Sequence, residues 1–209
     1  KTQQGGMAAV GLGWDQIKEF LVPGIVTACD NSPNSVPISG DADKLESVVA
    51  AVKQAHPDIP TTTLKVGQAY HSHHMLAFGD AYHQSMIDSG VVGRAPTVPF
   101  FSSVTGGRLS NTKLNPLGPH YWQANLERPV LFKTAVTSIL NSEDVANAIF
   151  LELGPHSALA GPLRQILTHE SSSASYIPSL IRRQNSAQNL LQAIGKLYSL
   201  HVPVDFQSI

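Results

Sequence analysis

The sequence of 209 residues predicts an α/β fold. Short apolar runs of strand length recur along the chain, and apolar residues at helical spacing lie between them. The two kinds of segment alternate as far as the C-terminal region, which favours a mainly parallel sheet covered by helices. With 42% hydrophobic residues, a chain of this length can bury a sizeable core.

In residues 5–70 the pattern predicts a small subdomain. Strands are expected at 7–12, 25–29, 36–39 and 61–70, and helices begin near Trp14 and near Leu45. Asp43 and Glu46 have the spacing of a capping pair at the start of the second helix. Pro37 suggests that its strand is at an edge or begins there. The order β-α-β-β-α-β is the ferredoxin-like arrangement.

Residues 71–209 predict a second, larger subdomain. Helices are expected at 75–86, 119–126, 130–140, from 163 onward and at 190–198, with strands at 98–104, 148–153 and 175–177. Met75, Phe78, Tyr82 and Met86 form one stripe of the first of these helices.

Charge and cysteine content exclude several classes of protein. Lys and Arg number 14 and Asp and Glu 15, so the net charge of −1 argues against a nucleic-acid binder. No apolar run approaches the ~18 residues of a membrane span. Cys29 is the single cysteine, so no internal disulfide forms and a reducing, cytoplasmic location is expected. Its simplest role is that of a small buried hydrophobic residue.

Three histidines lie where a strand is predicted to end and a helix to begin. They are His71, His73 and His74, in the run Tyr-His-Ser-His-His-Met at 70–75. Such junctions line the clefts of α/β proteins, and an imidazole there suits general acid–base catalysis. A polar loop with incidental histidines is an equal alternative. A metal site is disfavoured, because this order lacks the i, i+4 spacing of the helical zinc motif.

Two further patterns concern hydroxyl groups and turns. Gly-Pro-His-Ser at 154–157 either presents backbone N–H groups to an anion or makes a tight turn with Ser157 as helix N-cap. We favour the turn. No Gly-x-Ser-x-Gly occurs in the chain, so Ser72, Ser102, Ser103 and Ser157 are outside any nucleophile elbow.

Seven ordered blocks of sequence give the chain a family resemblance. They are GGMAAVGLG at 5–13, ACDNSPNSV at 28–36 with SGD at 39–41, AYHSHHM at 69–75, PFFSSVTG at 99–106, YW at 121–122 with NL at 125–126, PVLF at 129–132, and ELGPHSAL at 152–159. With these blocks the chain resembles the acyltransferase domains of polyketide synthases, most of all the fungal iterative type I enzymes. They are members of the family of malonyl-CoA:acyl-carrier-protein transacylases.

The resemblance implies a fold and a reaction. The fold would be an α/β-hydrolase-like large subdomain, here 71–209 in part, with a ferredoxin-like small subdomain at 5–70. In the family an elbow serine takes the malonyl group from CoA and passes it to the phosphopantetheine thiol of an acyl carrier protein, by covalent catalysis. No bound cofactor is implied, and the partners would be the carrier protein and the adjoining synthase domains.

The resemblance also assigns residues. The family's general base matches His71, and the backbone carbonyl that orients it matches Asn125. The residue before the base helps to choose the extender unit, and here the bulky Tyr70 implies malonyl, with Gln68 and Ala69 beside it in the substrate-binding segment. Asn31 matches an Asn-Ser-Pro turn near the cleft, where a structural role is the simplest.

The departures from the family limit what this chain can do. The elbow serine, the arginine that pairs with the malonyl carboxylate and the Gln-Gly segment of the oxyanion hole would all precede Lys1. We therefore expect the chain alone to be inactive, since losing a nucleophile costs several orders of magnitude in rate. The alternative is a noncatalytic module with the same fold that binds acyl-CoA or a carrier protein.

Overall fold

The computed structural model describes residues 4–109, 116–143 and 148–208. The chain divides into two compact units, Lys1–Ser142 and Glu143–Ile209. Among the described residues, no helix has both the length and the apolar character that a membrane span requires.

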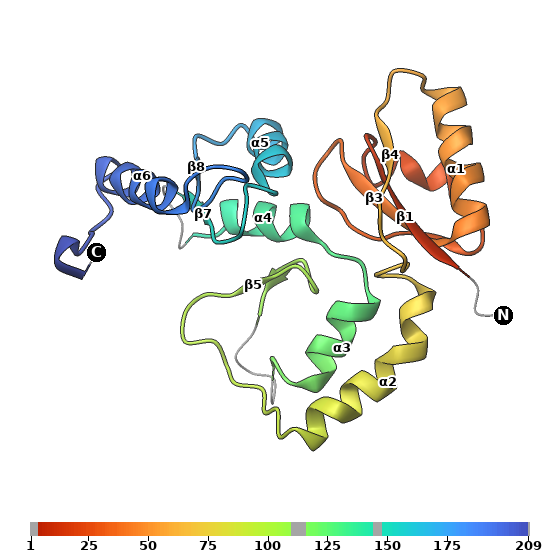
Figure 1. The fold of residues 1–209 in the computed structure, drawn as a ribbon, viewed down its shortest axis with the longest axis horizontal. Helices are drawn as coiled ribbons and strands as arrows, with labels where there is room; N and C mark the ends of the chain where they lie inside the picture. The colour runs from red at the N-terminus through yellow and green to blue at the C-terminus, as the bar shows by residue number, and fades with distance from the viewer. Residues whose placement is uncertain (1–3, 110–115, 144–147, 209) are drawn as a thin grey trace. The chain divides into compact units, whose positions relative to one another are not determined.

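The first unit begins with a four-stranded antiparallel sheet of order β2-β3-β1-β4. Its elements are β1 (Gly5–Val10), the 3₁₀ helix η1 (Ile17–Phe20), β2 (Ile25–Thr27), β3 (Val36–Asp41), α1 (Ala42–Ala55) and β4 (Thr61–Thr63). Figure 1 shows α1 lying along one face of this sheet. Leu45, Val48 and Val52 of α1 are buried there against Ile38 and the other apolar side chains of the strands.

Two predicted elements of this region are shorter than the sequence pattern indicated. The helix expected after Trp14 is the single turn η1, of which only Ile17 is buried. The strand expected at 61–70 ends at Thr63, because β4 pairs only with the last three residues of β1. Beyond it the Val66 N–H donates to the Leu64 carbonyl, which turns the chain away from the sheet.

Of the two positions expected for Pro37, the edge strand was wrong, because β3 is an inner strand, whereas the strand start is correct, because β3 begins at Val36. A proline in a central strand leaves one ladder position without a donor. The Pro37 carbonyl accepts from the Ala28 N–H at 2.8 Å, and the Ala28 carbonyl opposite accepts from the Val130 N–H at 2.9 Å. The chain at Val130 therefore supplies the hydrogen bond that Pro37 cannot make.

The capping pair was also misplaced by the sequence pattern. The N-cap of α1 is Asp41, and Asp43 lies within the first helical turn. The Asp41 side chain makes no capping hydrogen bond to the helix backbone. Its carboxylate is therefore free for other partners.

The rest of the first unit consists of helices and a short hairpin. The elements are α2 (His73–Asp88), β5 (Phe101–Ser102), β6 (Gly107–Arg108), α3 (Pro119–Glu127) and α4 (Phe132–Leu140). α2 packs beside α3 (Figure 1). The two come close at Gly79, where an added β-carbon would overlap the Glu127 carboxylate. Of the predicted apolar stripe on α2, Met75 and Met86 are buried, whereas the rings of Phe78 and Tyr82 are exposed.

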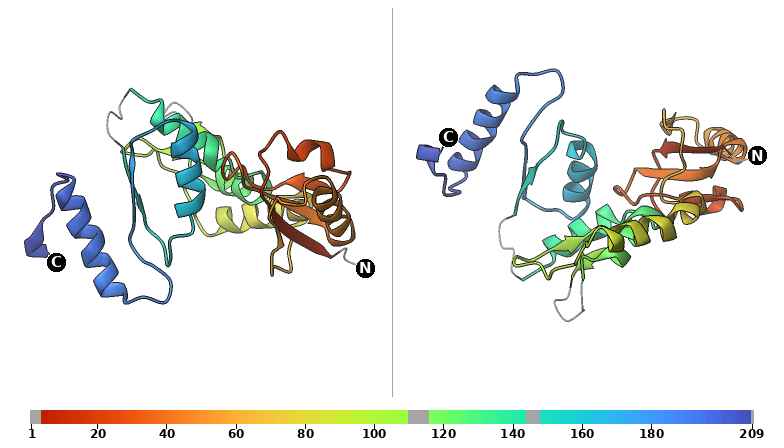
Figure 2. Two further views of the ribbon diagram at one scale, coloured as in Figure 1. Left: turned by 90° about the horizontal axis from the view of Figure 1, so that it is seen from above. Right: turned by 60° about the horizontal axis from the view of Figure 1, so that its bottom comes forward.

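The second unit contains a parallel strand pair. β7 (Ile149–Glu152) and β8 (Ser175–Pro178) are joined through α5 (Ala160–His169), and α6 (Ser186–Ser199) and the 3₁₀ helix η2 (Phe206–Ser208) follow. Figure 2 shows α5 beside the two strands, where Leu163, Ile166 and Ile177 are buried. Among the named strands of the described residues, β7 and β8 are the pair that runs parallel, and the other pairs are antiparallel. The mainly parallel sheet that the sequence predicted is therefore limited to these two strands.

Candidate functional site

The segment from Leu64 to Ser72 carries the candidate base and has no regular secondary structure. Ala69 is fully buried and touches Gly5 of β1 so closely that a β-carbon there would meet the Ala69 backbone nitrogen at 2.8 Å. The buried Ser72 hydroxyl donates to the Ala69 carbonyl at 2.6 Å and accepts from the His74 N–H at 3.2 Å. Ser72 is thus the N-cap of α2 and closes the turn that contains His71.

His71 has a left-handed backbone conformation with φ of 59°. Its Nδ1–H donates to the Arg128 backbone carbonyl at 3.0 Å, because a carbonyl can only accept. In the neutral ring the lone pair is therefore on Nε2. Partial burial lowers the pKa of His71 below its usual value, and the hydrogen bond to Arg128 opposes that shift. At neutral pH the ring is an uncharged proton acceptor with a fixed tautomer.

The Arg128 carbonyl is held in place by the chain on either side of it. Arg128 caps the C-terminus of α3. The following residue pair is anchored to the end of the sheet, where the Asp30 N–H donates to the Val130 carbonyl and the Lys133 N–H donates to the Asp30 carbonyl, both at 2.8 Å. A helix end and a short parallel bridge between Cys29 and Val130 thus aim this carbonyl at His71.

The predicted orienting carbonyl was that of Asn125. The structure assigns the 3.0 Å hydrogen bond to Arg128, which lies one helical turn closer to Pro129. The Asn125 backbone carbonyl has a smaller influence in the same direction, and both raise the pKa of His71. The sequence signal for Arg128 was its position directly before the Pro-Val pair, where a helix must end.

The other predicted site residues separate into two groups. Gln68 and Tyr70 are exposed on either side of the buried Ala69, so Ala69 packs beneath the segment and its neighbours face outward. The Asn31 N–H donates to the Ser35 carbonyl at 3.2 Å, within the turn that joins β2 to β3.

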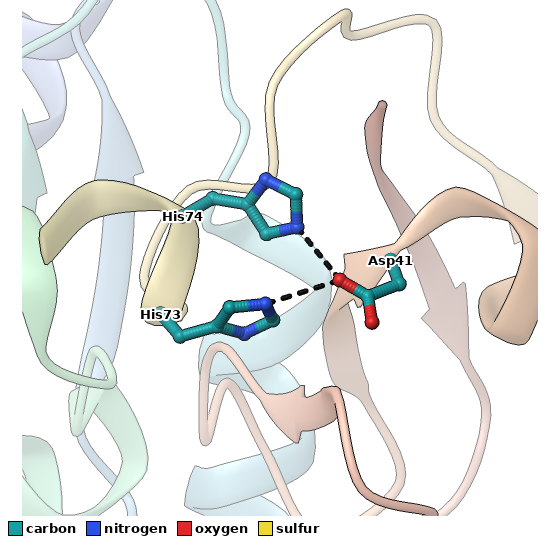
Figure 3. Close-up of side chains that lie close together, drawn as sticks. All are labelled: Asp41, His73 and His74. Atoms are coloured by element: carbon teal, nitrogen blue, oxygen red, sulfur yellow. Dashed lines mark hydrogen bonds and ion pairs between the residues drawn. The ribbon is translucent and has the colours of Figure 1, made fainter. Parts of the chain in front are cut away.

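The sequence pattern assigned no role to Asp41, a charged residue of this region. Asp41 is 3% exposed and lies at the end of β3. Oδ1 accepts from the Nε2–H groups of His73 and His74 at 3.0 Å each, and Oδ2 accepts from the Lys44 ammonium at 2.9 Å. Figure 3 shows both rings projecting from the start of α2 toward this one carboxylate oxygen. The Lys44 ammonium and then the His74 hydrogen bond lower the pKa of Asp41 well below its usual value.

The same three side chains form a possible metal-ligand set. One ligand atom from each of Asp41, His73 and His74 lies within 4.8 Å of the others. The ammonium of Lys44 already neutralises the carboxylate, and both imidazole N–H groups are used as donors to it. We therefore interpret the cluster as a hydrogen-bonded ion pair network.

Two of the serines noted in the sequence, Ser102 at the end of β5 and Ser157, lie at turns of the structure. Ser102 is buried, and its oxygen lies 2.8 Å from the Tyr121 hydroxyl and accepts from the Val104 N–H at 3.0 Å. Ser157 does not cap α5, whose N-cap is Leu159. Instead, the Glu152 carboxylate accepts from the Leu159 N–H at 3.2 Å and from the Tyr176 hydroxyl, and so closes the turn at 154–157.

The chain matches a family model over nearly its whole length. Residues 1–204 match the model described as the acyl transferase domain. Among curated proteins, it is 50% identical over 205 residues to a highly reducing polyketide synthase, sphB, of Aspergillus fumigatus, covering 98% of this chain and 8% of that protein. It is 46% identical over 194 residues to the squalestatin hexaketide synthase clz14 of Cochliobolus lunatus, covering 93% of this chain and 7% of that one. The chain thus spans less than a tenth of these synthases.

Solved structures give the same picture. The acyltransferase domain from module 8 of the salinomycin polyketide synthase superposes with a TM-score of 0.86 and 26% identity, over 98% of this chain and 47% of that one. The malonyl CoA-acyl carrier protein transacylase of Clostridium perfringens superposes with a TM-score of 0.79 over 96% of this chain and 60% of that one. At 19% identity, the second comparison shows likeness of fold alone.

Proposed function

Since the chain belongs to the acyl transferase domain family, we propose that it takes part in loading a malonyl group from CoA onto an acyl carrier protein within a polyketide synthase. The observation that carries the proposal is the His71 ring. One nitrogen is fixed on a backbone carbonyl, and the other is an uncharged acceptor beside the exposed Tyr70. That is the arrangement a general base needs.

In the proposed reaction His71 Nε2 accepts the proton of a serine hydroxyl as its oxygen attacks the thioester carbonyl. The carbon–sulfur bond breaks, and the imidazolium returns the proton to the departing CoA sulfur. The phosphopantetheine thiol then attacks the acyl-serine, with His71 again moving one proton, and the serine is regenerated. We propose that the serine belongs to an elbow outside these residues, since the chain has no Gly-x-Ser-x-Gly.

We further propose that residues 5–70 are a ferredoxin-like subdomain and that residues 71–209 are part of an α/β-hydrolase-like subdomain. The antiparallel strand order β2-β3-β1-β4 supports the first assignment, with η1 in place of the first helix. The parallel β7–β8 pair with its crossover helix α5 supports the second. The division of the chain at Ser142 falls inside the proposed second part.

The proposed substrate is malonyl-CoA, and the proposed partners are a carrier protein and the neighbouring synthase domains. Gln68 and Tyr70 would line the acyl pocket, while Ala69 supports them from beneath. A cytoplasmic location is part of the same proposal and rests on the single thiol, Cys29.

The test uses a complete acyltransferase domain that contains these 209 residues. Replacing the base, as in His71→Gln, should lower the rate of malonyl transfer from radiolabelled malonyl-CoA by about 10²–10⁴-fold. The control is His169→Gln, which changes an exposed histidine at the end of α5. Unchanged transfer in His71→Gln would contradict the proposed role of His71, whereas absence of transfer in the unmutated domain would favour the noncatalytic binding module.

A further inference from the structure

Asp41 is a buried carboxylate with a donor for each of its oxygens. The two imidazole N–H groups come from the first turn of α2, and the ammonium comes from the first turn of α1. A buried carboxylate is costly unless its oxygens are paired in this way. One side chain therefore fixes the start of α2 to the end of β3.

The fold makes room for this carboxylate and its ammonium partner. A β-carbon at Gly24 would overlap Asp41 Oδ2 and would lie 2.7 Å from Lys44 Nζ. Gly24 has φ of 97°, in the region that favours glycine. The Asp41 N–H also donates to the Gly24 carbonyl at 3.1 Å, so both backbone and side chain of Asp41 are tied at this place.

The segment held by Asp41 includes the candidate base. The chain from Leu64 to Tyr70 is half-exposed or exposed except at Ala69, and it belongs to no helix or strand. Upstream of His71 the Leu64 N–H donates to the Met7 carbonyl of β1 at 2.8 Å, and Ala69 packs on Gly5. Downstream of His71 the anchors are His73 and His74, two and three residues away, on Asp41.

We propose that Asp41 is a positioning residue for His71, acting through His73 and His74. The inference rests on the proposed function in one respect only, namely that His71 is the group whose position matters. Without the two imidazole anchors the first turn of α2 would lose both of its hydrogen bonds to the carboxylate at the end of β3. His71 would then leave its half-buried place and its hydrogen bond to Arg128.

The primary experiment compares Asp41→Asn with Asp43→Asn in this chain. Asp43 is exposed and lies two residues further along the same helix, so the pair is matched in chemistry and place. In Asp41→Asn the side-chain N–H₂ group would face either the two imidazole N–H groups or the Lys44 ammonium. Two donors cannot form a hydrogen bond with each other, so part of the network is lost. The readout is the pH titration of the His71 ring by NMR, with its signals assigned by their absence in His71→Gln.

Two explanations for a change in the His71 pKa in Asp41→Asn predict shifts of opposite sign. Release of His71 into water raises its depressed pKa toward the ~6.5 of an unperturbed histidine. Removing a nearby negative charge without any movement would lower the pKa further. We expect the pKa of His71 to rise in Asp41→Asn and to stay unchanged in Asp43→Asn. A His71 pKa that falls or does not change in Asp41→Asn would overturn the proposal.

A second pair of variants separates anchoring from metal binding and holds even if Asp41→Asn does not fold. His74→Gln keeps an N–H donor near the position of Nε2 but is a poor zinc ligand, whereas His74→Ala removes the donor. We expect His74→Gln to retain the wild-type His71 titration and His74→Ala to shift it. Equal effects of both variants, or a shift on adding EDTA to the wild-type chain, would overturn the proposal. Because the His71 titration needs no turnover, its outcome is independent of the outcome of the loading assay with His71→Gln.

Discussion

At the scale of single residues, His71 owes its chemistry to backbone atoms more than to other side chains. The Arg128 carbonyl fixes its tautomer, and partial burial lowers its pKa and keeps it uncharged at neutral pH. The positive φ is tolerated because Ser72 closes the turn immediately after it. A sequence pattern can indicate the histidine, but it cannot show which carbonyl it faces.

Tyr70 is the residue at which the proposed substrate choice is tested. A ring beside the base would fill the space that an α-methyl group needs, and overpacking costs about 1–3 kcal/mol. Tyr70→Ser in a complete domain should therefore raise the ratio of methylmalonyl to malonyl loading, measured by mass spectrometry with both CoA esters in competition. Tyr82→Ser, which changes an exposed ring on α2, is the control. An unchanged ratio in Tyr70→Ser would count against the proposed pocket.

The Cys29 thiol should react slowly with alkylating agents. Burial raises its pKa to about 11, and the hydrogen bond with the Val130 backbone offsets only part of this shift. Because the thiolate is the reactive form, alkylation by iodoacetamide at pH 7–8 should be far slower than for a free cysteine and should accelerate up to about pH 11. The measurement is the rate of mass increase of the folded chain across pH, with the urea-unfolded chain as control. Rates that match the unfolded control would contradict the assignment.

At the scale of elements, the position of the 64–72 segment, which carries His71, depends on how closely it lies against β1. Gly5 leaves no space for a side chain, since a β-carbon there would meet the Ala69 nitrogen and Cβ at 2.8 Å. By contrast, a β-carbon at Gly67 would meet nothing within 4 Å. Gly5 lies against the 64–72 segment and Gly67 is part of it, and the two glycines differ in the space around them.

Gly5→Ala should therefore destabilise the first unit by about 1–3 kcal/mol, since the backbone at Ala69 must move. Gly67→Ala should be neutral or stabilising by up to about 1 kcal/mol, because it reduces the freedom of the unfolded chain. Urea unfolding of both variants gives the comparison. Equal stabilities would show that the 64–72 segment adjusts without cost, and the proposed tight support of His71 would then be wrong.

In the second unit the Glu152 carboxylate links β7, β8 and the turn before α5. It accepts from the Tyr176 hydroxyl and from the Leu159 N–H. Burial, and then the hydrogen bond to Glu152, raises the pKa of Tyr176. Removing one donor to a charged acceptor, as in Tyr176→Phe, should cost about 1–2 kcal/mol near pH 7.

The pH dependence of that effect has a definite sign. A phenol whose pKa is higher in the folded state contributes stability below the unfolded pKa of ~10 and loses it as the pH rises further. The free energy of unfolding should therefore decline above pH ~10 in the wild-type chain more than in Tyr176→Phe. Tyr198→Phe, at a 60% exposed ring on α6, is the matched control. A parallel decline in all three chains would refute the role of Tyr176.

At the scale of the whole molecule, the sequence predicted the kinds of element better than their pairing. Helical spacing at Leu45, Val48 and Val52 indicated α1, because that periodicity is a local property. The pairing of Val130 with the residues after β2 was not predictable, since it depends on a proline that leaves a carbonyl without its usual donor. The partner of His71 was expected at Asn125, one helical turn before the end of α3, whereas the hydrogen bond is made by Arg128 at that end. Asp41 was missed because its three partners come from two different helices.

The family assignment leads to a prediction about the chain as a whole. The 209 residues contain the proposed base and no Gly-x-Ser-x-Gly, and they span 47% of the salinomycin acyltransferase structure. Incubated with malonyl-CoA, this chain should show no covalent malonyl group by intact mass spectrometry. A fusion that places the preceding part of the Aspergillus fumigatus synthase before Lys1 should gain one, because we propose that this part supplies the elbow serine. The gain should disappear when the elbow serine of the fusion is changed to alanine and fall sharply with His71→Gln. A malonyl adduct on the unfused chain would show that another of its residues is the nucleophile, and the proposed division of the catalytic groups would be wrong.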